Sequence, residues 1–175
     1  MAYKFTDPSL AGFFPIAGTD SGISTVGGTT IPSPPAGPGT IVRAVDPTYG
    51  EGEFILLKGV ASTVVGSCVV YDSTSFATTL APAGTNLPRA VAFAMAATNT
   101  TTLWGWYQIS GQVVAKKTSG LAIASLAAVG VKTTGLIAAT GTGKEIEGAL
   151  TIAKSTTSTT VKLMVDRPAM QGRIT

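Results

Sequence analysis

From residue 40 onward, short apolar runs are separated by glycine, threonine, aspartate and proline, and most runs follow the two-residue period of a β-strand. Residues 91–96 alternate large apolar side chains with alanines. In residues 161–166, Val161, Leu163 and Val165 point to one side while Lys162 and Asp166 point to the other, which predicts a strand with one buried and one wet face. Further strands are predicted over 54–60 and 67–72. Pro168 is expected to end the last strand, because proline lacks a backbone donor.

Residues 103–116 are predicted to form two strands joined at Ser110-Gly111, a pair of residues typical of a hairpin turn. Residues 121–129 are rich in alanine and leucine, but the segment is short and bounded by glycines, so a loop or strand is favoured over a helix. The uncharged stretch 90–115 contains the polar run 98–102, which suits two strands and a turn better than a membrane span. These short strands predict an all-β fold, either a β-sandwich or a small β-barrel.

The first 39 residues have a different character. They are rich in proline and glycine and show little periodicity, which predicts an extended, irregular N-terminal arm before a β domain over residues 40–175. The arm nevertheless carries large apolar side chains, among them Phe13, Phe14 and Ile16. An apolar arm of this kind is expected to lie on a surface, which is either a partner protein or its own domain.

Charged residues make up only 12% of the chain while apolar residues make up 45%, so a monomer would expose much neutral surface. This composition favours an obligate assembly. The net charge is +3, but the twelve lysines and arginines are scattered along the sequence and only Lys116 and Lys117 are adjacent. Nucleic-acid binding requires clustered cations, so no nucleic-acid partner is expected.

The chain contains no histidine and a single cysteine. Serine and cysteine nucleophiles that depend on histidine are therefore excluded, as are the usual zinc ligand sets. We expect no catalytic residues, no cofactor and no metal, and hence a protein that is not an enzyme. Cys68 lies in an apolar run and is expected to be a small buried side chain.

Two patterns resemble sites of chemistry. Residues 138–145 resemble a phosphate-binding loop, but Ala138 replaces the first glycine and Glu145 replaces the serine or threonine after the lysine, so a turn between strands is expected. Paired carboxylates occur at Glu51 and Glu53, and again at Glu145 and Glu147. Residues two apart share a face of a strand, so either pair has the spacing for cation binding or acid/base work. A hydrolase using the second pair is the least favoured hypothesis.

The segment 103–109 is the most informative one. Alternation places Trp104, Trp106 and Gln108 on one face, and Leu103, Tyr107 and Ile109 on the other. A strand in a two-layer domain needs only one apolar face, so the second must be covered by the arm, a neighbouring subunit or a partner. Gly105, between the tryptophans, predicts close backbone approach or a kink. The residues predicted to form the subunit or capsid interface are Phe13, Phe14, Ile16, Trp104, Trp106 and Tyr107.

Several of these segments together resemble small structural proteins of tailed bacteriophages. The resemblance covers roughly residues 39–168 and is carried by the runs GTIVRAVDP (39–47), GEGEFILLKGV (50–60), VYD (70–72), WGWYQISG (104–111) and DRP (166–168). It implies a capsid decoration, or cement, protein of the phage head. Such proteins bind outside the major capsid shell, often as homotrimers at local threefold positions, and bridge neighbouring capsomers.

The resemblance therefore implies two partners, further copies of the chain and the major capsid protein, without nucleic acid or membrane. It implies synthesis in the cytoplasm of a bacterial host and a final location on the capsid exterior of the virion. The alternative hypothesis is a carbohydrate-binding module of a head or tail fibre, with Trp104 and Trp106 as the platform on which a sugar ring stacks.

Overall fold

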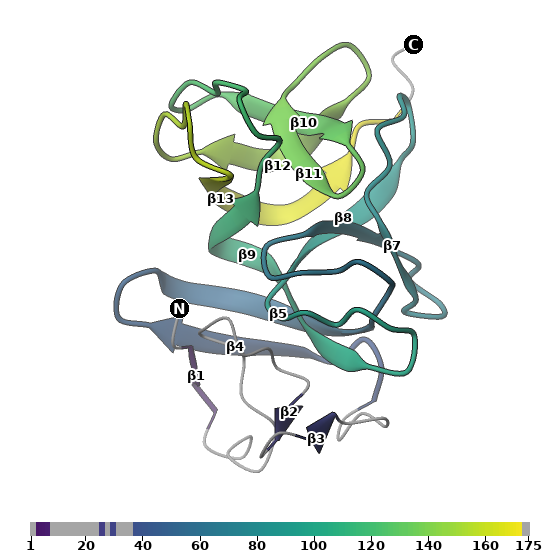
Figure 1. Ribbon diagram of the computed structural model, residues 1–175. Coiled ribbons are helices and arrows are strands. Elements are labelled where there is room, and N and C mark those ends of the chain that lie inside the picture. The colour runs from purple at the N-terminus through teal and green to yellow at the C-terminus, as the bar shows by residue number, and fades with distance from the viewer. Residues whose placement is uncertain (1–2, 8–24, 27–28, 31–36, 173–175) are drawn as a thin grey trace.

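The computed structural model of the chain describes residues 3–7, 25–26, 29–30 and 37–172, and every regular element among them is a β-strand (Figure 1). The strands are β1 (Lys4–Phe5), β2 (Thr25–Val26), β3 (Thr29–Thr30), β4 (Ile41–Asp46), β5 (Gly50–Lys58), β6 (Cys68–Tyr71), β7 (Thr78–Leu80), β8 (Arg89–Ala94), β9 (Trp104–Lys116), β10 (Ala128–Thr133), β11 (Leu136–Ala139), β12 (Glu145–Thr151) and β13 (Thr160–Met170). The prediction of an all-β fold is confirmed. No helix in the described residues has the length and apolar character needed to cross a membrane.

Eleven strands form one antiparallel sheet, whose main order is β1-β4-β5-β9-β8-β13-β12-β10-β11. β6 pairs with β8 and β7 pairs with β6, while β2 and β3 form a separate two-stranded sheet. The large sheet folds over on itself without closing into a barrel, and Figure 1 shows β9 running between β4–β5 on one side and β10–β13 on the other. The uncharged stretch 90–115 forms β8, a turn and β9, as predicted.

The predicted hairpin at Ser110-Gly111 is wrong, because β9 continues through both residues. The first half of β9 pairs with β5, and from Gly111 onward the strand pairs with β13 alone. Gly111 has a φ of 96°, and a Cβ on it would lie 2.5 Å from the carbonyl oxygen of Glu51. The pair therefore marks a bend at which one long strand changes partners, rather than a reversal of the chain.

The last strand also differs from its prediction. Residues 161–166 alternate between buried and exposed positions as expected, but Pro168 does not end the strand, which extends to Met170. The ladder with β12 shifts register between Glu147 and Ala149, so proline occupies an irregularity where its missing N–H is tolerated. Arg167, with a φ of 45°, lies at the same irregularity.

Three apolar clusters fill the fold. The largest joins β6 and β8 to β9–β13, and includes Phe93, Val113, Ile137 and Leu163. The second contains Phe54 and Trp106, and the third contains Tyr107 and Ile109. The two faces predicted for the tryptophan strand therefore pack into two different clusters. Both faces are buried by the chain itself.

The start of the N-terminal arm belongs to the sheet. β1 pairs with β4, and the Tyr3 ring is buried against Phe54 with ring centroids 4.7 Å apart. The Tyr3 hydroxyl donates to the carbonyl oxygen of Gln112, 3.1 Å away. Residues 3–6 therefore lie on the chain's own domain, which is one of the two placements expected for the arm.

A group of buried hydroxyls surrounds Tyr107 inside the fold. The Tyr107 hydroxyl is 2.5 Å from Oγ1 of Thr98, and further bonding to Thr78 and Thr63 partly offsets the effect of burial on its pKa. Burial is the larger effect, and it raises the pKa of Tyr107 to about 12. Burial likewise raises the pKa of Tyr3 to about 12.

These two tyrosines predict a loss of stability in alkali. In the unfolded chain a tyrosine ionises near pH 10, so between pH 10 and about 12 the unfolded state loses protons that the folded state retains. The free energy of unfolding is therefore expected to fall as pH rises through this window, by about 1.4 kcal/mol per pH unit for Tyr107. Urea unfolding at pH 9 and 11.5 measures the effect. Tyr107→Phe is expected to make the pH dependence shallower, and an unchanged slope would contradict the assignment.

Candidate interaction surface

The structure places the predicted aromatic residues mainly in the core. Trp106 and Tyr107 have no exposed surface, and Trp104 is partly buried beside Trp106. The two tryptophans therefore do not form an exposed pair on which a sugar ring stacks. Phe13, Phe14 and Ile16 lie outside the described residues.

Gly105 has the role its position predicts. A Cβ on this residue would lie 2.4 Å from Cγ2 of Thr98, so the loop after β8 packs directly on the backbone of β9. The close backbone approach expected between the two tryptophans is confirmed.

Several of the residues considered as candidates for chemistry have structural roles. Glu53 accepts hydrogen bonds from Arg43, at 3.1 Å, and from Arg167, so this member of the first carboxylate pair ties β4 and β5 to β13. Residues 140–144 form the turn between β11 and β12, as predicted. Cys68 is fully buried, as expected, and burial raises the pKa of its thiol. The described residues contain no group of three histidine, cysteine or acidic side chains arranged to hold a metal ion.

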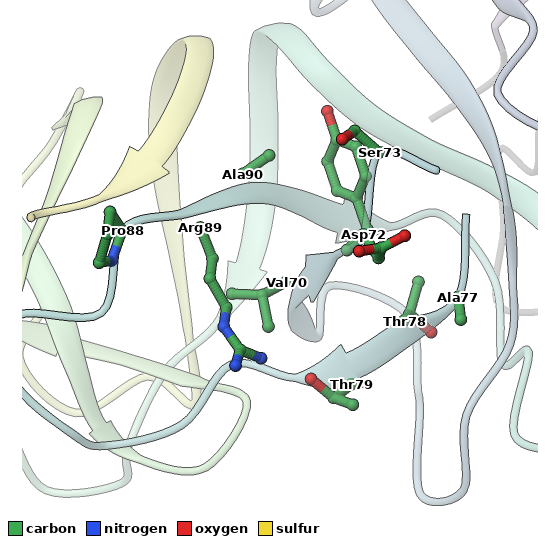
Figure 2. A pocket seen from close by; sticks show the side chains of 10 residues that line it. Val70, Asp72, Ser73, Ala77, Thr78, Thr79, Pro88, Arg89 and Ala90 are labelled. Atoms are coloured by element: carbon green, nitrogen blue, oxygen red, sulfur yellow. The ribbon is translucent and has the colours of Figure 1, made fainter. Parts of the chain in front are cut away.

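A hollow of about 470 Å³ lies at the end of β6, β7 and β8 (Figure 2). Arg89 extends from the start of β8 toward β7, while Ala90 beside it points to the other side of the sheet. Hydrogen bonds from Ser75 and Thr74, and to a smaller degree the charge of Arg89, lower the pKa of Asp72. This hollow combines one cation, one anion and several hydroxyls, so its charges offset each other and we assign it no ligand.

The most distinctive surface is the outward side of β9, β12 and β13, which we call the outer face. Strand register places Val114 opposite Lys162, Gln112 opposite Met164, and Met164 opposite Leu150. Met164 and Leu150 are 48% and 49% exposed, although both are large apolar side chains on regular strands. Their neighbours on the inward side of β13, such as Leu163, are fully buried in the largest apolar cluster. The outer face thus carries an exposed apolar centre.

Next to this centre lies a second hollow of about 470 Å³, which we call the lysine hollow. Its lining includes Tyr49, Val114, Lys154 and Lys162, together with the hydroxyl-rich segment 155–160. No carboxylate lines it. The hollow therefore adds a cationic, hydroxyl-bearing border to the apolar centre of the outer face.

Two interactions shape the lysine hollow. Oδ1 of the buried Asp46 accepts the backbone N–H groups of Thr48 and Tyr49, at 2.7 and 3.0 Å, and so fixes the turn between β4 and β5. This turn holds the Tyr49 ring at the hollow, where Nζ of Lys162 lies 5.5 Å from the ring centroid. On the opposite border, the hydroxyl of Ser155 donates to the carbonyl oxygen of Thr160 and holds the segment 155–160 in a compact loop.

The gathering of lysines was not predicted from the sequence. Lys116 lies opposite Thr160, on the same face as Val114 and Lys162, although 46 positions separate Lys116 from Lys162. Only the pairing of β9 with β13 brings them together, and local sequence carries no signal of that pairing. Three lysines that are scattered along the chain, Lys116, Lys154 and Lys162, therefore share one face of the fold.

A scan against protein-family models finds none that matches the chain, and a search of curated proteins finds no significant match.

Proposed function

We propose that the chain is a structural protein of a tailed-phage head, which binds the outside of the major capsid shell and stabilises it by bridging neighbouring capsomers. It acts as a homotrimer on the capsid exterior, after synthesis in the bacterial cytoplasm. The proposal is supported by the sequence resemblance over residues 39–168 and by the low proportion of charged residues. It involves no catalysis and no cofactor.

The outer face is the observation that carries the proposal. Exposed Leu150 and Met164 form a cross-strand pair at its centre, and lysines and hydroxyls border this centre. An apolar centre with a polar border is the usual composition of a protein–protein contact. The centre of the face lies on β12 and β13, each of which is paired on both sides, so it is presented without a cost for ordering a loop.

A protein that binds only the expanded shell stabilises that state by mass action, and many copies with modest interfaces suffice. We therefore expect the chain to bind expanded, empty shells of the phage that encodes it, prepared without this protein. Binding is measured by co-sedimentation, and the mass of the free protein in solution gives its oligomeric state. A stable monomer that does not associate with expanded shells would overturn the proposal.

A further inference from the structure

The lysine hollow gathers positive charge on one side of the sheet. Lys154 and Lys162 are exposed, and Lys116 is partly buried on the same face. Within the described part of the chain, none of these three lysines forms an ion pair. Residues diagonally opposite on neighbouring antiparallel strands, such as Lys116 and Lys162, have backbones about 7–8 Å apart.

A fourth lysine contacts the loop that lines this hollow. Lys117 is 2% exposed, and its ammonium group donates to the carbonyl oxygens of Leu121 and Thr156. Thr156 belongs to the loop that lines the lysine hollow. No carboxylate is paired with Lys117 among the described residues, so its charge is not neutralised locally. Four of the chain's eight lysines, Lys116, Lys117, Lys154 and Lys162, thus lie in or next to the loop between β12 and β13.

The surroundings of the hollow favour a polypeptide partner over a nucleic acid. The exposed pair Leu150 and Met164 continues from the lysines along the same face, since Lys162 and Met164 are two residues apart on β13. Apolar side chains find partners on a protein but not on a sugar-phosphate backbone. A partner with carboxylates beside apolar side chains complements both parts of the outer face.

We propose that the lysine hollow binds a carboxylate-bearing segment of the major capsid protein, whose neighbouring apolar side chains cover Leu150 and Met164. This inference rests on the proposed function and adds the chemistry of the contact. Lys154 and Lys162 provide the ammonium groups that meet the carboxylates, and the hydroxyls of Thr156 and Ser158 provide further donors. Lys117 adds a fixed positive charge at the loop that lines the hollow.

The test compares shell binding by the wild-type protein with that of the double variant Lys154→Glu and Lys162→Glu. The matched control is the double variant Lys132→Glu and Lys144→Glu, which changes the net charge equally but lies outside the hollow. We expect the hollow variant to bind expanded shells about thirtyfold more weakly and the control to bind within about twofold of wild type. Wild-type binding is expected to weaken as salt is raised, since the charges are exposed.

A second double variant, Lys154→Gln and Lys162→Gln, removes the charges without reversing them and is used if the glutamates prevent folding. Labelled poly-L-glutamate and an oligothymidylate serve as defined probes in the same buffer. We expect lysine-dependent binding of the polyglutamate and weaker binding of the oligothymidylate. Preference for the oligothymidylate would overturn the inference in favour of a nucleic acid.

Two outcomes of the shell experiment separate this inference from the proposed function. Equal shell binding by wild type and by both hollow variants would overturn the role of the hollow while leaving the capsid function in place. Absence of shell binding by the wild-type protein would overturn the proposed function, and the inference with it.

Discussion

Replacing Trp106 with alanine is expected to lower the free energy of unfolding by about 4 kcal/mol, because the side chain is completely buried. The indole packs in the second apolar cluster, and the Phe5 ring approaches it edge-on with centroids 6.0 Å apart. Alanine at this position leaves a cavity. The neighbouring strands β5 and β8 are hydrogen-bonded to β9 and cannot move in to fill it. Urea unfolding followed by far-ultraviolet circular dichroism measures the loss without relying on tryptophan fluorescence.

Leu126→Ala is the control for this substitution. Leu126 is 78% exposed, so its truncation is expected to change the free energy of unfolding by no more than about 0.5 kcal/mol. If Trp106→Ala instead unfolds like the wild type and loses only shell binding, then Trp106 acts at an interface and not in the core.

Gly59→Ala is expected to destabilise the fold by about 3 kcal/mol. A Cβ on Gly59 would lie 2.3 Å from the carbonyl oxygen of Thr98 and 2.6 Å from that of Thr100, and backbone atoms cannot rotate away as a side chain can. The Gly59 N–H donates to the carbonyl oxygen of Leu103, at 2.8 Å, so moving the strand end to relieve the clash strains this bond. Thermal unfolding monitored by circular dichroism checks the effect.

Gly141→Ala provides the comparison for Gly59→Ala. Gly141 lies in the turn before β12, and a Cβ there would meet no atom within 4 Å. Its substitution is expected to leave the melting temperature nearly unchanged. Equal effects at the two glycines would show that steric contact with the loop after β8 does not govern stability.

Sequence periodicity predicted correctly on which face of β13 and of the tryptophan strand the large side chains lie. Along β13, Val161 and Leu163 are buried while Lys162 is exposed, as their alternation indicates. Alternation also assigned Trp106 and Tyr107 to opposite faces, which the two separate clusters confirm. Both predictions are correct because the side of a strand to which a side chain points depends only on local backbone geometry.

The features that sequence did not predict depend on pairing between distant strands. Ser110-Gly111 has the composition of a hairpin turn, yet β13, about 50 positions further on, offers β9 a second partner and keeps the strand extended. The surroundings of the lysine hollow have the same origin, because Lys162 of β13 and Lys154 of the preceding loop line it, and the pairing of β9 with β13 places Lys116 on the same face. The covering of one face of the tryptophan strand likewise depends on Phe5 of β1, which is remote in sequence.

The position of β13 in the sheet affects the order in which the strands pair during folding. β13 is the last described strand, and it pairs with β8, β9 and β12. The second half of β9 and the inner edge of β12 thus have no partner until residues 160–170 have left the ribosome. The pairings of β13 with β8 and β9, which lie far from it in sequence, form slowly, because long loops must close first. The outer face, which β13 completes, is therefore expected to be among the last surfaces to form during folding.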